Sequence, residues 1–77
     1  MSTEIKMPKF GETMEEGMIV NWKKKVGDDV NEGEVIVEVD TDKSTLEVES
    51  TVSGRLLKIL VEVNQTVPVN TPIAIIG

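Results

Sequence analysis

Residues 34–50 read Glu34-Val-Ile-Val-Glu-Val-Asp-Thr-Asp-Lys43-Ser-Thr-Leu-Glu-Val-Glu-Ser50. Apolar and polar residues alternate on both sides of the centre of this stretch, which is typical of two half-buried antiparallel strands. The register that keeps the valines on one face and the acidic residues on the other pairs Val39 with Leu46. That register leaves Asp42 and Lys43 as a two-residue loop. The stretch therefore predicts a β-hairpin with Lys43 at its exposed tip.

The chemistry of this hairpin is unusual in two respects. Tight two-residue loops favour Asn-Gly or Asp-Gly rather than Asp-Lys, so something other than folding has selected this lysine. The outer face of the hairpin is acidic and carries Glu38, Asp40, Asp42, Glu47 and Glu49. This face is either a docking signal for a basic partner or an ordinary solvated surface.

The chain also repeats itself at an offset of 37 residues. Three glycines fall on a glycine or an asparagine at this offset: Gly17 on Gly54, Gly27 on Asn64, and Gly33 on Asn70. Glycine opposite asparagine indicates a backbone position with positive φ. Each half is too small to bury its own apolar face, so we expect the halves to pack together. The repeat predicts a flattened β-barrel or sandwich with pseudo-two-fold symmetry.

We expect one all-β domain over residues 1–77. Strands are predicted at 4–8, 18–23, 34–41, 44–50, 55–62 and 72–76, with short paired stretches near Val30 and Val67, and residues 10–17 are predicted to form a surface loop. At the offset of 37, Lys43 corresponds to Lys6 and to a position just past Gly77. Both termini should therefore lie at the end of the domain opposite the lysine.

Composition excludes several classes of function. The 77 residues include no cysteine and no histidine, which removes disulfides, zinc sites and imidazole catalysis. The net charge of −6 argues against nucleic acid and anionic membranes as partners. No apolar run approaches the roughly 20 residues of a membrane span, and no secretory signal is visible. We expect a monomeric, cytoplasmic, bacterial domain that is not itself an enzyme, because no nucleophile, base and pocket combine.

With these residues in view, the chain resembles the lipoyl domains of 2-oxo acid dehydrogenase complexes along essentially its whole length. The matching segments are 7–17, Trp22 with 26–28, and 38–44. The last is the most specific, because the family typically has Thr-Asp-Lys-Ala where this chain has Thr-Asp-Lys-Ser at 41–44. The resemblance implies a barrel-sandwich hybrid of two four-stranded antiparallel sheets.

The resemblance also implies a set of roles. Lys43 would carry lipoic acid through an amide, and Asp42 and Ser44 would present it to a lipoate ligase or lipoyl transferase. Glu12 and Thr13, together with Asp40 and Glu47 of the acidic face, would contribute to partner recognition. The remaining partners implied are a thiamine-diphosphate-dependent 2-oxo acid decarboxylase, an acyltransferase domain that delivers the acyl group to coenzyme A, and dihydrolipoamide dehydrogenase.

The opening Met-Pro-Lys-Phe-Gly-Glu-Thr-Met at 7–14 is more similar to the pyruvate and acetoin branches of the family than to the 2-oxoglutarate branch. By the same resemblance the chain would be the N-terminal part of a longer dihydrolipoamide acyltransferase. Some dehydrogenase components carry such a domain instead.

Other interpretations remain open. Biotin carrier domains resemble one another in flanking the modified lysine with methionines, whereas here the flanks are Asp42 and Ser44. An unmodified, hairpin-bearing adaptor module would also fit the residues. A calcium loop starting at Asp40 is not expected, because its sixth position is Thr45 rather than glycine and its twelfth is Thr51 rather than glutamate.

Overall fold

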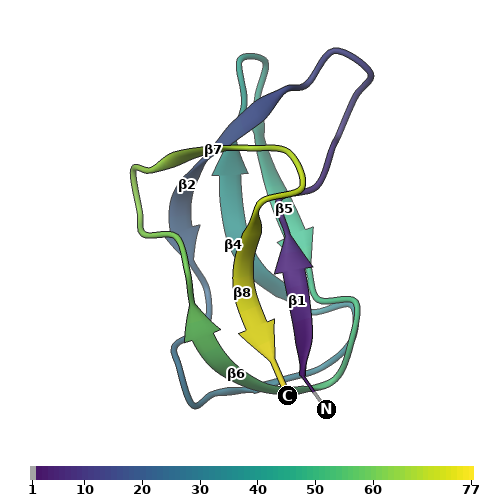
Figure 1. Cartoon of the computed structure of the whole chain (residues 1–77), viewed down its shortest axis with the longest axis vertical. Coiled ribbons are helices and arrows are strands. Elements are labelled where there is room, and N and C mark those ends of the chain that lie inside the picture. Colours follow the sequence, from purple (N-terminus) through teal and green to yellow (C-terminus); the bar gives the residue numbers. More distant parts are fainter. Residues whose placement is uncertain (1) are drawn as a thin grey trace.

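The computed structural model describes residues 2–77, which form eight strands in two sheets (Figure 1). The strands are β1 (Thr3–Lys6), β2 (Glu16–Trp22), β3 (Asp29–Val30), β4 (Val35–Asp40), β5 (Thr45–Glu49), β6 (Gly54–Ile59), β7 (Thr66–Pro68) and β8 (Pro72–Ile76). One sheet has the order β1-β8-β6-β3 and the other β5-β4-β2-β7, and every pairing is antiparallel. The predicted fold of two four-stranded antiparallel sheets is confirmed. Residues 2–77 contain no helix long and apolar enough to cross a membrane.

The predicted two-fold symmetry extends to strand register. Ile19 pairs with Val39 in one sheet, and Leu56 pairs with Ile76 in the other, with both partners displaced by 37 residues. Directly after each of these pairs the register shifts by one residue. The two halves therefore share an irregularity as well as a regular pattern.

The turns that match in sequence also match in conformation. Gly27 has φ 98° and Asn64 has φ 73°, while Gly33 has φ 86° and Asn70 has φ 76°. All four lie in the left-handed region that Gly and Asn tolerate best. The interpretation of glycine opposite asparagine as a positive-φ position is confirmed at both turns.

The core lies between the two sheets. It consists of Ile5, Met7, Ile19, Val30, Ile36, Val37, Val39, Val48, Leu56, Val61, Ile73, Ala74 and Ile76. Ile36 stands at the same alternating positions as Glu38 and Asp40, which predicts an outward-facing side chain, and this expectation is wrong because Ile36 is fully buried. The pairing of β4 with β5 shifts between Val35 and Val37, so alternation does not continue through this point.

Two further expectations require correction. Gly17 does not belong to a surface loop: β2 begins at Glu16, and Gly17 is buried inside it. Lys6 is not the symmetry equivalent of Lys43. Ile5 on β1 pairs with Ala74, as Val48 on β5 pairs with Val37, so the offset between these two strands is 43 residues rather than 37.

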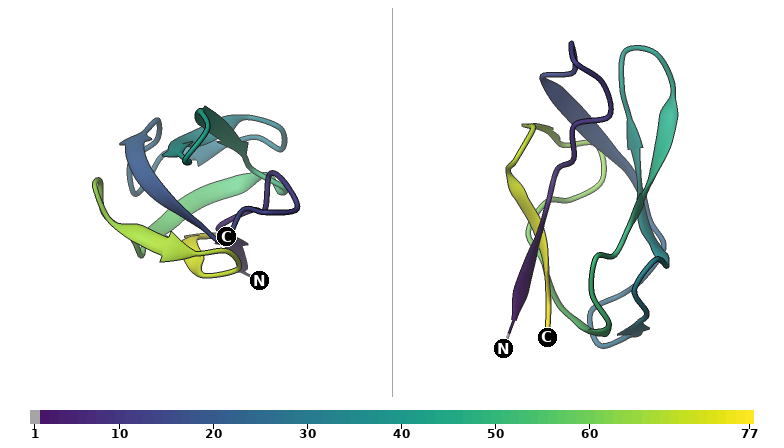
Figure 2. Two further views of the ribbon diagram at one scale, coloured as in Figure 1. Left: turned by 90° about the horizontal axis from the view of Figure 1, so that it is seen from above. Right: turned by 90° about the vertical axis from the view of Figure 1, so that its right-hand side faces the viewer.

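The placement of the termini is nevertheless as predicted. Strands β1 and β8 pair from Thr3 with Ile76 onward, so the two ends of the chain lie side by side. They sit at one end of the long axis, and the β4–β5 hairpin projects from the other (Figures 1 and 2). The molecule measures 32 × 21 × 17 Å along its principal axes. A segment linked to either terminus would therefore start far from Lys43.

Candidate functional site

The hairpin has the register expected from side-chain alternation. Val39 pairs with Leu46 and Asp40 pairs with Thr45, which leaves residues 41–44 as the connection. Val39 is fully buried, so its strand is anchored in the core close to the tip. The connection is held on a rigid support and extends into solvent (Figure 1).

The conformation of the tip depends on Thr41. The Thr41 hydroxyl accepts hydrogen bonds from the backbone N–H groups of Lys43 and Ser44, both at 3.2 Å. The Thr41 backbone N–H and its hydroxyl both donate to the Ser44 carbonyl at 2.9 Å. Threonine hydroxyls make local turns of this kind. Sequence reasoning gave Thr41 no role, although a threonine directly before a predicted turn is a usable signal.

This arrangement explains how Asp-Lys occupies so tight a loop. Within residues 2–77 the non-glycine residues with positive φ are Asn64 and Asn70, so neither Asp42 nor Lys43 has one. The turn is therefore neither type I′ nor type II′, both of which require positive φ at a central residue. The threonine side chain supplies hydrogen bonds in place of the usual glycine-based geometry.

Lys43 is exposed, as are its neighbours Asp42 and Ser44. In the described part of the chain the ion pairs involve Lys23, Lys24 and Arg55, and the Lys43 amine takes part in none of them. An exposed amine on a fixed turn suits covalent modification by another enzyme, because the incoming active site meets no competing side-chain contact. The Lys43 amine is thus suited to carry a group attached through an amide bond.

The loop before β2 lies beside the hairpin and forms a groove with it. Phe10, Gly11, Thr13 and Met14 line one wall, and residues 41–44 with Leu46 line the other, around a volume of about 230 Å³. Thr13 therefore lies beside the hairpin tip, on the opposite wall of this groove. Glu12 is also exposed but lines a separate depression with Lys9, Phe10 and Gly11.

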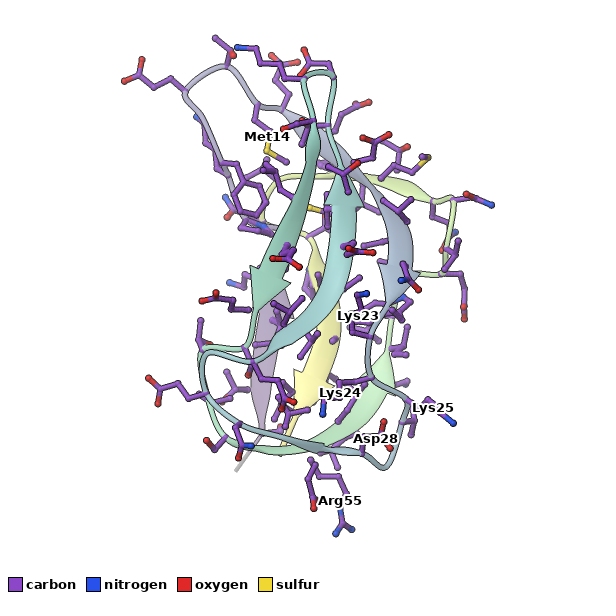
Figure 3. The ribbon with its side chains drawn as sticks, turned by 180° about the vertical axis from the view of Figure 1, so that it is seen from behind. Met14, Lys23, Lys24, Lys25, Asp28 and Arg55 are labelled. Carbon is purple, nitrogen blue, oxygen red and sulfur yellow. The ribbon has the colours of Figure 1, made fainter. Side chains whose placement is uncertain are left out.

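Met14 gives this loop a defined shape. Its sulfur accepts a hydrogen bond from the Phe10 backbone N–H at 3.3 Å. Its side chain is half-buried, packs against the core and lies near the hairpin end of the molecule (Figure 3). Phe10 remains 42% exposed at the edge of the groove. The loop thus presents a partly apolar surface next to Lys43.

The acidic residues of the hairpin divide into separate groups. Asp40 lines a second hollow, of about 420 Å³, with residues 13–18, Asp42 and Thr66. Glu47 lies on β5 directly opposite Glu38, as predicted. Glu38 accepts a hydrogen bond from Asn21 at 3.1 Å and lies 3.8 Å from the Lys23 ammonium, which offsets repulsion from Glu47.

The two ends of the molecule differ in how their charges are balanced. Lys24, Lys25 and Arg55 lie with Asp28 toward the end remote from Met14 and the hairpin (Figure 3), and Lys24 and Arg55 pair there with Glu34 and Asp29. The hairpin end carries Asp40 and Asp42 together with Glu15 and Glu16 around its larger hollow. The surface around the lysine is therefore acidic. Within residues 2–77, however, no group of three or more His, Cys, Asp or Glu side chains is placed to hold a metal ion.

Comparison with known proteins adds family evidence. The Biotin_lipoyl family model, described as "Biotin-requiring enzyme", matches residues 3–76. The dihydrolipoyllysine-residue acetyltransferase component of the pyruvate dehydrogenase complex of Rickettsia prowazekii is 52% identical over 100% of this chain and 19% of its own length. The pyruvate dehydrogenase E1 component subunit beta of Rhizobium meliloti is 47% identical over 99% of this chain and 18% of its own length. This chain therefore spans about a fifth of these relatives.

A solved structure gives the same result for the fold. The lipoyl domain of the 2-oxoglutarate dehydrogenase complex from Azotobacter vinelandii superimposes with a TM-score of 0.77 and 31% sequence identity. The match covers 96% of this chain and 94% of that one. The similarity thus extends to both sheets.

Proposed function

Because this chain belongs to the Biotin_lipoyl family, we propose that it is a swinging-arm carrier whose lipoyl group is attached to Lys43. Lipoyl domains of acyltransferase components carry lipoic acid covalently on a lysine. The observation that carries the assignment to Lys43 is its place at the tip of a rigid hairpin, exposed and free of ion pairs among the described residues.

The protein's own contribution is position. When attached, the lipoyl group supplies a dithiolane that accepts and releases an acyl group, chemistry that belongs to the cofactor. The β4–β5 hairpin holds the attachment point away from the body of the domain, and the exposed lysine adds a flexible side chain to its reach. A tethered domain of this kind visits its partners at high effective concentration.

The proposed partners follow from this role. They are a lipoate ligase or lipoyl transferase, a 2-oxo acid decarboxylase, an acyltransferase domain and dihydrolipoamide dehydrogenase. The names of the Rickettsia and Rhizobium relatives support the pyruvate branch, and the parent chain is proposed to be a bacterial, cytoplasmic acyltransferase component. We assign presentation of the lysine to the ligase to Asp42 and Ser44, and recognition of the decarboxylase to Glu12 and Thr13. Asp40 and Glu47 of the acidic face are proposed to contribute to partner recognition.

Mass spectrometry tests the attachment site. The domain is incubated with lipoic acid, ATP and a bacterial lipoate ligase, and the modified peptide is sequenced. We expect one lipoyl adduct on Lys43, none in Lys43→Gln, and full modification in the control Lys25→Gln, whose lysine is also exposed. The same incubation with biotin and a biotin ligase should leave the chain unmodified. A biotin adduct on Lys43 would select the biotin carrier, and absence of either adduct would favour the adaptor.

Lys43→Gln should leave the fold intact. The side chain is exposed and takes part in none of the ion pairs of residues 2–77, so its replacement should change the free energy of unfolding by less than about 0.5 kcal/mol. Thermal unfolding followed by circular dichroism measures this. A much larger loss would show that the lysine has a structural role.

A further inference from the structure

We propose that Thr41 is the positioning residue that sets the conformation in which Lys43 is presented to the enzyme that modifies it. The inference deepens the proposed function and rests on it. It concerns a residue whose hydroxyl bonds to the backbone of the turn rather than to the lysine amine.

Thr41 organises the hydrogen bonding of the hairpin tip. In the described part of the chain, every hydrogen bond made by residues 42–44 has Thr41 as its partner. The hydroxyl accepts from the backbone N–H groups of Lys43 and Ser44 and donates to the Ser44 carbonyl. Removal of this one oxygen would leave both N–H groups without a partner in the protein.

Apart from the Thr41 hydroxyl, the tip has one restraint among the described residues, the backbone hydrogen bond from the Thr41 N–H to the Ser44 carbonyl. Asp42, Lys43 and Ser44 are all exposed, so no core packing holds them. The turn also lacks the positive-φ residues that make type I′ and II′ hairpins intrinsically stable. Without the Thr41 hydroxyl, the tip would sample several conformations of similar free energy.

The conformation of the tip affects how well Lys43 can be modified. An enzyme that acylates this lysine must receive its amine in one orientation, and misplacement of a reacting group by about 1 Å can cost 100-fold in rate. When only a fraction of the molecules holds the competent conformation, apparent affinity falls by that fraction. A mobile tip should therefore raise the KM of the ligase for the domain more than it lowers kcat.

Four variants test the proposal. Thr41→Val keeps the shape of the side chain but removes the hydroxyl. Thr41→Ala removes the hydroxyl together with the methyl group, and Thr41→Ser retains the hydroxyl. The matched control is Thr45→Val, which removes the hydroxyl that donates to Asp40 at 3.3 Å on the same hairpin, outside the turn.

Ligase kinetics with lipoic acid and ATP provide the main readout. We expect kcat/KM to fall about ten-fold or more for Thr41→Val and Thr41→Ala, mainly through KM. Thr41→Ser and Thr45→Val should stay within about two-fold of the unaltered domain. Thermal unfolding measured alongside should show that all four variants are folded at the assay temperature, because Thr41 is outside the core.

Amide hydrogen exchange supplies a second readout, which applies to the unaltered domain as well as to the variants. In the unaltered domain the amides of Lys43 and Ser44 should exchange more slowly than that of Asp42, which has no acceptor among the described residues. In Thr41→Val this protection should disappear, and in Thr45→Val it should persist.

The carrier assignment of Lys43 and the positioning role of Thr41 are contradicted by different results. If lipoate ligase fails to modify Lys43 of the unaltered domain, the carrier assignment itself falls. If the unaltered domain is modified and Thr41→Val is modified equally well, only the role of Thr41 falls. Equal exchange of the amides of residues 42–44 in the unaltered domain would also overturn it.

Discussion

Two glycines occupy positions where the chain packs too closely for a side chain. A Cβ added to Gly17 would lie 2.7 Å from Cγ1 of Val39 and 3.0 Å from the Met7 sulfur. A Cβ added to Gly54, its equivalent in the second half, would lie 2.9 Å from the Gly77 carbonyl oxygen. The distances of 2.7 Å and 2.9 Å are shorter than real Cβ contacts allow. Glycine recurs here because there is no space for a side chain.

Gly17→Ala should therefore destabilise the domain. Forcing a methyl group into a packed core typically costs about 1–3 kcal/mol, which exceeds the roughly 0.4–1 kcal/mol gained by restricting the unfolded chain. We expect a net loss of about 1–2 kcal/mol, measured by urea unfolding. The control is Gly11→Ala, because a Cβ at Gly11 has nothing within 4 Å. Equal stability of the two variants would contradict the steric explanation.

The site was only partly predictable at the level of single residues. Lys43 followed from alternation, because a register that buries Val37 and Val39 leaves few choices for the loop. The hydrogen bonds of the Thr41 hydroxyl did not follow from the hydrophobic pattern, because that pattern does not determine how a side-chain hydroxyl lies against the backbone of a turn. The burial of Gly17 was missed for a similar reason, since close packing against Val39 involves two strands.

At the level of elements, the two halves use different residues for the same turn. Gly27 donates its backbone N–H to the Leu56 carbonyl at 2.7 Å, and Asn64 donates to the Ile19 carbonyl at 2.7 Å. Ile19 and Leu56 are themselves a repeat pair. Each turn thus attaches to the opposite half of the molecule, and its positive φ aims the N–H group at that strand.

Asn64→Ala should cost stability, whereas Asn64→Gly should not. An alanine at φ 73° incurs a left-handed penalty of about 1 kcal/mol or more, whereas glycine adopts this region readily. We expect the alanine variant to unfold at lower urea concentration and the glycine variant to match the unaltered domain within about 0.5 kcal/mol. If both lose stability equally, the asparagine side chain rather than the backbone conformation matters at this turn.

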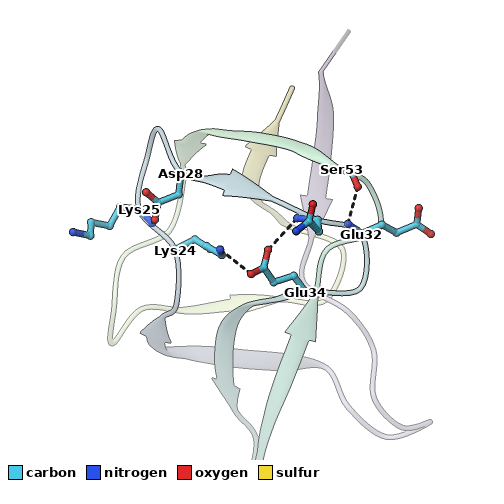
Figure 4. A network of polar contacts seen from close by, with 7 residues as sticks. Lys24, Lys25, Asp28, Glu32, Glu34 and Ser53 are labelled. Carbon is cyan, nitrogen blue, oxygen red and sulfur yellow. Dashed lines mark hydrogen bonds and ion pairs between the residues drawn. The ribbon is translucent and has the colours of Figure 1, made fainter.

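A polar network joins the loops on either side of β3 (Figure 4). The Lys24 ammonium donates to Glu34 at 2.8 Å, and the other carboxylate oxygen of Glu34 accepts from the backbone N–H of Asn31 at 3.0 Å. The backbone N–H of Glu32 donates to the Ser53 hydroxyl at 2.8 Å. This network fixes the end of the domain that lies away from the hairpin.

The Lys24–Glu34 pair predicts a pH dependence of stability. The hydrogen bond from Lys24, and then the one from Asn31, lowers the pKa of Glu34 below its ordinary 4.5, while the hydrogen bond with Glu34 raises the pKa of Lys24 above 10.5. The unfolded state binds a proton at Glu34 first as the pH falls, so the stabilisation is present above pH 4.5 and is lost as pH drops through the lowered pKa. At the alkaline limit it is present below pH 10.5 and is lost as pH rises through the raised pKa of Lys24.

Glu34→Gln tests the predicted loss of stability at acid pH. The stability difference between the unaltered domain and the variant should be constant at neutral pH and should shrink below pH 4.5. Urea midpoints measured at successive pH values check this. The control is Glu4→Gln, whose exposed carboxylate has no ion pair in residues 2–77. A difference that stays constant down to the acid transition would exclude the pair as its source.

At the level of the whole molecule, the internal repeat explains why so much of the fold was predictable. A pattern of apolar positions and turns that occurs twice implies two equivalent units, and units too small to fold alone must pack together. The shifts in register after Ile19 and Leu56, and the burial of Ile36, were not predictable, because they arise from the fit between strands rather than from periodicity along one strand.

The two halves do not correspond to the two sheets. Strands β1 and β3, from the first half, share a sheet with β6 and β8 from the second, and β2 and β4 share the other sheet with β5 and β7. Each half therefore leaves most of its strand edges unpaired in the absence of the other. Association of the halves gives the backbone groups of both their hydrogen-bond partners and buries the apolar faces of both at the same time. This predicts one cooperative unfolding transition.

Division of the chain at the hairpin tip tests this interdependence. Fragments 1–41 and 42–77 fall at or below the roughly 40 residues under which domains rarely fold without additional support, and neither contains the strands of a complete sheet. We expect each fragment alone to give an undispersed amide NMR spectrum. Mixed in equal amounts, they should recover the dispersed spectrum of the intact domain with a concentration dependence, because the exposed tip contributes no core contact. A folded spectrum from either fragment alone would show that one half holds a core of its own, and the symmetry would then reflect two independent units.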